Sequence, residues 1–287
     1  MRILDIVHAA ANSQFSILNS QIKVDFWGHL DELRGSLLKA LAAVAVGAVA
    51  AFCCKDWLFA VVMAPSRPDF ITYQLFKRIA GVGTDFHISL FNPELAQQFI
   101  VHMRVALWAG LLIVSPYVLY VLFHFVAPGL YAHERRHAVR AVGSGYIMFL
   151  LGVALNYFLI FPLTFRFLGT YQVSPDVPNQ IALTSYIDIL LMLCFLLGVV
   201  FELPVLSWLL AKMGVLKAQF MTRYRRHAVV VVLIIAAIIT PTGDAVTLSL
   251  VALPIYALYE VSILVVRRTR AVVCLMVCSI NCLQLLS

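Results

Sequence analysis

A run of five residues carries side chains that could bind zinc and activate water. In HERRH, residues 133–137, His133 and His137 stand one helical turn apart with Glu134 between them, as zinc proteases require. The two intervening residues, Arg135 and Arg136, speak against that chemistry, because burying unpaired arginines in a membrane costs several kcal/mol each. A proline-glycine pair just upstream also ends an apolar stretch. The pattern therefore predicts a surface segment without a metal, and no catalytic site.

The composition decides which solvent surrounds these residues. Hydrophobic residues make up 62% of the chain and charged residues 12%, about half the charged share of a soluble domain. This predicts an all-α integral membrane protein. The net charge of +7 comes without a cluster of basic and aromatic residues, so a nucleic-acid partner is not expected. The six cysteines include no C-x-x-C pair, which disfavours a disulfide framework or a structural zinc site.

Apolar stretches predict six transmembrane helices. They cover about 36–54, 105–127, 141–165, 189–211, 228–240 and 245–266. The fifth and sixth are expected to be short, and the fifth covers only about 20 Å of a hydrocarbon core of about 30 Å. We therefore expect a thinned bilayer and a concave, lipid-facing groove beside these two helices.

The distribution of basic residues predicts the orientation. The N-terminus, the second and fourth loops and the C-terminus hold 15 of the 21 Lys and Arg residues, and the other three loops hold 6. By the positive-inside rule, both termini should lie in the cytoplasm.

Three carboxylates stand out against this background. Glu32 precedes the first span and Glu134 follows the second, so both should face the cytoplasm, where they could hold a basic peptide or balance charge within the protein. Glu202 lies inside the fourth span, where an acid is costly and should face a polar groove. Prolines at 116, 162, 204 and 254 should bend their spans, either as fixed kinks or as hinges.

Several segments, taken together, resemble the TatC family, the multispanning receptor of the twin-arginine protein translocase. They are HLDELR, SPYVLYVLFHFVAPGLYAHERR, NYFLIFPLTFRFL, FELPVL and TPTGDAVTLSLVALPIYALYE, in order from about Phe26 to Arg268. The resemblance implies a receptor and core subunit that is not an enzyme and has no cofactor. It would bind paired-arginine signal peptides and export folded proteins with TatA-type and TatB-type partners and the proton-motive force. It also implies an oligomer in the bacterial cytoplasmic (inner) membrane.

The resemblance assigns roles to individual residues. Glu32 and Glu134 match the carboxylates that hold the arginine pair. Arg34, Arg135, Arg136 and Phe125 match positions around that site.

Three further positions match the family away from the signal-peptide site. Glu202 matches the lone acid of the fourth span, where it should open toward the concave side. Arg104 falls at the outer end of the second span, and Asp244 falls at the outer turn of the last hairpin.

Both ends of the chain depart from the family pattern. Residues 1–22 have no counterpart and are expected to form an N-terminal extension of a membrane domain at 23–270. The tail at 271–287 is apolar where the family has a polar end, and we expect it to lie on or near the membrane.

Two other functions are alternatives to a signal-peptide receptor. An ion-coupled secondary transporter would also have several spans and an acid at depth, but it would normally show paired, interrupted spans around a midplane site. No such internal pairing is found in the sequence. The second alternative is the zinc protease considered above.

Overall fold

The computed structural model describes residues 34–80, 89–126, 135–171, 180–212, 215–240 and 244–285. Five of its helices are long and apolar enough to cross a membrane, which agrees with an integral membrane protein. These candidate spans are Arg34–Cys53, Gln97–Leu122, Val142–Thr170, Leu183–Lys212 and Ala245–Arg268.

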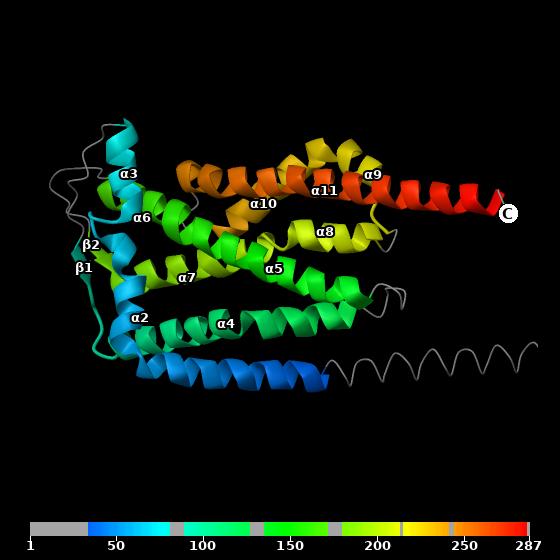
Figure 1. Cartoon of the computed structure of the whole chain (residues 1–287). Coiled ribbons are helices and arrows are strands. Elements are labelled where there is room, and N and C mark those ends of the chain that lie inside the picture. Colours follow the sequence, from blue (N-terminus) through cyan, green and yellow to red (C-terminus); the bar gives the residue numbers. More distant parts are fainter. Residues whose placement is uncertain are drawn as a thin grey trace, which may run out of the picture.

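The spans run back and forth between two ends of an elongated bundle (Figure 1). The "loop end" carries the short elements between spans, and the "tail end" is where the last helix finishes. The loop end holds α2 (Lys55–Val62), the 3₁₀ turn η1 (Ala64–Ser66), α3 (Ile71–Ala80), β1 (Ser89–Phe91) and β2 (Gln180–Ala182). The two strands pair in parallel, with Ser89 opposite Gln180 and Phe91 opposite Ala182.

The remaining elements form the bundle. They are α4 (Gln97–Val126), α5 (Arg135–Leu155), the π-helical turn η4 (Asn156–Ile160), α6 (Phe161–Thr170), α7 (Leu183–Val200), α8 (Leu203–Lys212), α9 (Ala218–Arg223), α10 (Arg225–Ile239) and α11 (Ala245–Leu285). The third span consists of α5, η4 and α6, and the fourth span consists of α7 and α8.

The last hairpin confirms one predicted length and corrects another. Helix α10, the predicted fifth span, has only 15 residues, so the count of six spans stays a prediction. The expectation of a short sixth helix is wrong, because α11 is a continuous helix of 41 residues that also includes most of the apolar tail. Pro254 lies inside α11 without ending it, and good helix formers follow Val266. The position of the tail relative to the membrane stays a prediction.

Two glycines let neighbouring spans approach closely. A Cβ atom on Gly110 of α4 would lie 2.4 Å from the backbone nitrogen of Ala48 in the first helix. A Cβ atom on Gly152 of α5 would lie 2.8 Å from the carbonyl oxygen of Leu197 in α7. Backbone contact through small residues is a common way to pack helices in lipid, where the hydrophobic effect gives little drive.

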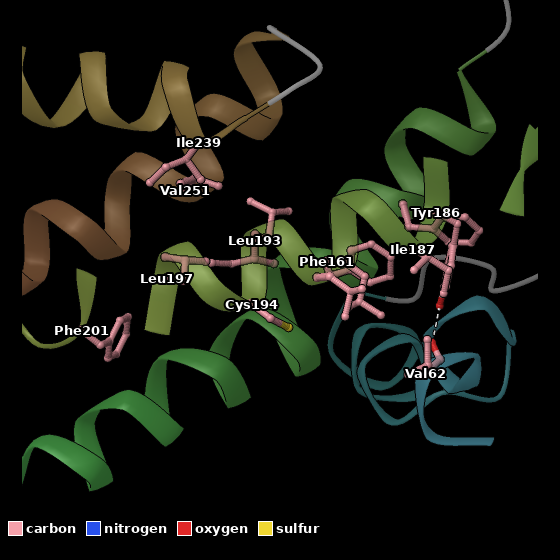
Figure 2. Close-up of a cluster of buried hydrophobic side chains, with 14 of the residues drawn as sticks. Val62, Phe161, Tyr186, Ile187, Leu193, Cys194, Leu197, Phe201, Ile239 and Val251 are labelled. Atoms are coloured by element: carbon pink, nitrogen blue, oxygen red, sulfur yellow. Dashed lines mark hydrogen bonds between the residues drawn. The ribbon is translucent and has the colours of Figure 1, made fainter. Parts of the chain in front are cut away.

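The core is centred on α7, whose residues Ile187, Leu193 and Leu197 are fully buried. Figure 2 shows Leu193 and Leu197 toward Ile239 of α10 and Val251 of α11, and Ile187 beside Phe161 of α6. Helix α7 therefore joins the last hairpin to the third span.

Candidate functional site

Glu202 lies at a break in the fourth span. Helix α7 ends at Val200 and α8 begins at Leu203. The cause is Pro204, which has no N–H to donate to the Val200 carbonyl oxygen and so cannot continue the regular helix. Just before it, the Glu202 backbone N–H donates to the Val199 oxygen, three residues earlier, at 3.1 Å. In a regular α-helix it would donate to the residue four positions earlier. An acid in the middle of an apolar span thus coincides with a change in the helix.

The carboxylate of Glu202 has no visible hydrogen-bond partner. The residue is 6% exposed, and among the described residues neither Oε1 nor Oε2 finds a donor. A buried polar group without a partner costs free energy, and a charged one costs more. The fold therefore keeps this acid at the expense of stability, which is typical of a functional position.

Glu202 does not line the large apolar groove among the helices near the loop end, and its opening toward a concave side stays a prediction. A groove of about 550 Å³ lies among α2, α4, α5 and α7, and its wall is almost wholly apolar. The Glu202 side chain is buried instead, on a span whose α8 part packs mainly against α11.

A polar seam joins α4 and α7 near the loop end. Arg104 Nη1 donates to both carboxylate oxygens of Asp188, at 2.7 and 2.9 Å. Further toward the loop end, Gln97 Nε2 donates to Thr184 Oγ1 at 2.6 Å. The Arg104 and Asp188 side chains are 49% and 51% exposed, so the ion pair orients the helices more than it stabilises them.

Arg104 was predicted from the sequence, but its partner Asp188 was missed. The available signal was an aspartate near the start of an otherwise apolar run, SYIDILLM, because an acid in such a run needs a partner.

A second polar cluster lies on the last hairpin. Arg225 Nη2 donates to Glu260 Oε2 at 2.7 Å, and the Tyr256 hydroxyl donates to Glu260 Oε1 at 3.1 Å. The Tyr259 hydroxyl donates to the Met221 carbonyl oxygen at 2.8 Å, which ties α9 to α11. Sequence reasoning missed Glu260, although it is an acid inside a predicted span.

Asp244 caps the last helix. Its Oδ2 accepts a hydrogen bond of 2.7 Å from the Thr247 backbone N–H, which is the geometry of an N-cap residue. The structure thus gives Asp244 a role in folding, and the functional role implied by the resemblance stays a prediction.

The residues predicted to hold a signal peptide fall mostly outside the described side chains. Glu32 and Glu134 lie outside the described residues, as does His133. Arg34 begins the first helix and is exposed. The backbone places Phe125 in the last turn of α4 and Arg135 and Arg136 at the start of α5.

These segments all lie at the tail end (Figure 1). The predicted contacts of these residues with a peptide stay predictions.

The structure does not test whether the HERRH run, residues 133–137, binds a metal. Within the part of the chain that the structure describes, no three His, Cys, Asp or Glu side chains gather as metal ligands would. The HERRH run is only partly inside that range, so the absence of zinc there stays a prediction.

Comparisons with known proteins point to one family. A family model described as Sec-independent protein translocase protein (TatC) matches residues 28–254. The chain is 34% identical over 242 residues to the Sec-independent protein translocase protein TatC of Koribacter versatilis, covering 84% of each chain. It is 32% identical to that of Deinococcus radiodurans, covering 85% of this chain and 86% of the relative.

A solved structure agrees with these sequence relatives. A crystal structure of the twin arginine translocase receptor TatC superposes with a TM-score of 0.69 at 28% identity, over 84% of this chain and 99% of that one.

Proposed function

The chain belongs to the TatC family of Sec-independent protein translocase proteins, and on this premise we propose that it is the receptor for paired-arginine signal peptides. The family is a component of a protein translocase and not an enzyme. The observation that carries the proposal is the likeness to a solved twin arginine translocase receptor along 99% of that receptor's length. The stretch matched by the family, 28–254, includes both Glu32 and Glu134.

The chemistry of recognition follows from the two carboxylates. A guanidinium group offers a fork of N–H donors that a carboxylate can accept in pairs, and such charge-assisted bonds are about twice as strong as neutral ones. Two carboxylates at one membrane face, Glu32 and Glu134, can therefore select two neighbouring arginines over two lysines. Arg34, Arg135 and Arg136 set the local charge, and Phe125 offers an apolar contact beside them.

The proposal extends to the topology and to the partners. The bias of Lys and Arg supports an orientation with both termini in the cytoplasm, so that the tail end is cytoplasmic. Membership of the family supports the bacterial inner membrane as the location. Export of folded cargo would use the proton-motive force, TatA-type and TatB-type single-span partners, and an oligomer of this chain. The 15 residues of α10 cover about 22 Å, against a hydrocarbon core of about 30 Å, which supports local thinning of the bilayer beside it.

The test replaces each carboxylate with alanine. Glu32→Ala and Glu134→Ala should each weaken binding of a paired-arginine signal peptide by about tenfold to a hundredfold, because a hydrogen bond to a charged group contributes about 1.5–3 kcal/mol. The measurement is cross-linking of a peptide that carries a photoreactive residue, titrated into membranes containing the protein.

Two controls make this test specific. Glu94→Ala removes an exposed carboxylate at the loop end and should leave cross-linking unchanged. A peptide with paired lysines should bind weakly to every variant. Full cross-linking by the Glu32→Ala/Glu134→Ala double variant would contradict the assignment.

The zinc-protease alternative has its own test. Purified protein should contain no stoichiometric zinc by elemental analysis, and His137→Ala should leave export intact. One zinc per chain, lost in that variant, would restore the protease reading.

A further inference from the structure

We propose that the fourth loop and the adjoining part of α11 form a binding surface for the headgroup of an anionic phospholipid. This surface, called the loop-four face, comprises Lys217, Phe220, Arg223, Tyr224 and Arg226 with Arg267 and Arg268 of α11. All seven side chains are exposed. The proposal concerns the lipid around the protein and does not depend on signal-peptide binding.

The end of the fourth span marks the level of the membrane surface. Lys212 is the last residue of α8, and its Nζ lies 5.5 Å from the centre of the Trp208 ring. Tryptophan and lysine at the end of a span are typical of the boundary between hydrocarbon and headgroups. The fourth loop follows directly, so its side chains lie at headgroup depth.

Large apolar side chains of this loop face outward. Val215 is 68% exposed, Phe220 57% and Tyr224 42%. The rings of Phe220 and Tyr224 lie 4.6 Å apart, and His227 extends the row at 5.5 Å from Tyr224. Aromatic and basic residues together on a segment between spans are typical of a surface that lies in the membrane interface.

The loop is held firmly enough to present these groups together. Met221 of α9 is buried with Ile263 and Val266 of α11, and the Tyr259 hydroxyl bonds to the Met221 carbonyl oxygen. Because Arg267 follows Val266 directly, the cations of α9 and those of α11 lie on neighbouring elements (Figure 1).

The surface carries positive charge that its own segment does not balance. From Leu203 to Leu285 the sequence contains two carboxylates, Asp244 and Glu260. Asp244 caps the start of α11 at the loop end, and Glu260 binds Arg225 at 2.7 Å. Among the described residues, the exposed cations of the loop-four face have no carboxylate partner.

The chemistry favours a lipid over an acidic protein segment. A phosphodiester accepts hydrogen bonds from several guanidinium groups at once. The acyl chains of a phospholipid would also cover Val215, Phe220 and Tyr224, which an acidic hydrophilic segment would leave in water. Clusters of Lys and Arg next to a membrane span are a recognised pattern for anionic lipid.

The experiment measures lipid preference at Trp208. The protein has four tryptophans, and Trp27→Phe, Trp57→Phe and Trp108→Phe leave Trp208 as the single fluorophore. This variant is placed in phosphatidylcholine bilayers containing increasing amounts of brominated phosphatidylglycerol or brominated phosphatidylcholine, without any signal peptide. The ratio of quenching efficiencies gives the preference for the anionic headgroup.

We expect phosphatidylglycerol to be preferred by about fivefold for each cation that contacts the headgroup. Replacing Arg223, Arg226 and Arg267 with glutamine should lower the ratio toward one, by about fivefold for each of the three that contacts the headgroup. The matched control, Lys77→Gln/Arg78→Gln on α3, removes exposed cations at the opposite end and should keep the preference. A ratio near one before any of these charge changes, or one that the triple glutamine variant leaves unchanged, would overturn the proposal.

A salt titration tests the same idea without the triple variant. Raising the salt concentration from about 0.1 M to about 1 M shortens the screening length from about 10 Å to about 3 Å, so the preference for phosphatidylglycerol should fall. A preference that resists salt would show that charge does not cause it and would also overturn the proposal.

Discussion

The third and fourth spans each carry a proline at the second residue of a helical segment, Pro162 in α6 and Pro204 in α8. Each proline deprives the carbonyl four residues earlier of its usual donor. In the third span that carbonyl belongs to Phe158, and the Thr72 hydroxyl of α3 donates to it. The π-helical turn η4 takes up the change in helical geometry, so the third span is bent and the carbonyl freed by Pro162 has a donor. Its remaining buried polar atoms without a partner among the described residues, Asn156 Oδ1 and Thr164 Oγ1, belong to uncharged groups.

More hydroxyl groups strengthen the loop end around the third span. The Tyr73 hydroxyl lies 3.1 Å from the Pro65 oxygen and 3.0 Å from the Pro162 oxygen. Tyr157 and Tyr186 donate to the Val61 and Val62 oxygens at 2.6 and 2.9 Å, and Figure 2 shows the second of these bonds. Those two carbonyls belong to the last turn of α2, where a helix has no donors of its own.

The fourth span shows the opposite outcome. Its break leaves both oxygens of Glu202 buried without a donor among the described residues. The bend at Pro162 is explained by folding alone, because the carbonyl that this proline frees has a donor. The break at Glu202 is not, because it carries a buried acid without a hydrogen-bond partner among the described residues. The comparison separates a structural bend from a candidate working site, although the sequence presents both simply as prolines in apolar runs.

The largest expected effect is on Glu202. Glu202→Leu should lower export by about tenfold or more, equivalent to losing a polar contact of about 1.4 kcal/mol in the working state. Glu202→Gln keeps the shape and polarity and should impair export less. Thermal unfolding of both variants should match the wild type or exceed it, because an unserved buried acid is removed.

The measurement for Glu202 is export of a folded reporter with a paired-arginine signal. If the leucine variant exports normally, the break at Glu202 has a role in folding alone, like the bend at Pro162. The proposed difference between the two spans would then be wrong.

The next effect concerns Tyr73, which is 0% exposed. Burial raises the pKa of its hydroxyl, so it stays a donor throughout the physiological range. Tyr73→Phe should lower the free energy of unfolding by about 1–3 kcal/mol, because the single O–H donor shared by the Pro65 and Pro162 oxygens is lost. Thermal unfolding in detergent measures the change, with Tyr117→Phe on the accessible face of α4 as the control. An unchanged unfolding midpoint would show that water replaces the hydroxyl.

The smallest effect is the sharpest test of the third-span bend. Thr72→Val should lower the free energy of unfolding by about 1 kcal/mol, because the Phe158 carbonyl loses its hydrogen-bond donor. In a Pro162→Ala background the alanine N–H can serve that carbonyl, so the same Thr72→Val change should cost less. A double-mutant cycle measures this coupling. Equal costs in both backgrounds would show that Thr72 does not compensate for the proline.

Local patterns predicted much of the architecture. Apolar runs predicted the membrane class and the positions of the spans, and the place of Glu202 inside an apolar run singled it out as an unusual acid. Runs of hydrophobic residues report on the solvent and on helix length, which are local properties. The predicted length of the last helix was wrong because the prediction followed the apolar run, which the arginines among residues 267–270 interrupt, whereas no proline or glycine after Val266 ends the helix.

The polar partners could not be predicted in the same way. Thr72 and Phe158 are 86 residues apart, and Arg104 and Asp188 are 84 apart. Their pairing depends on how the spans are arranged in space, which no local pattern in one sequence contains. The predicted signal-peptide residues came from family resemblance alone, and the side chains of most of them lie outside the described structure.

The parallel pair of β1 and β2 has a consequence for biogenesis. Ser89 meets its partner Gln180, which is made 91 positions later. A chain emerging from the ribosome in order must therefore synthesise the third span and reach the fourth before the loop end can close. Until then, the Val62 carbonyl lacks its donor, the Tyr186 hydroxyl. Closure of the loop end is thus a late step of insertion, and a chain truncated before residue 180 should be recognised by membrane proteases as unfinished.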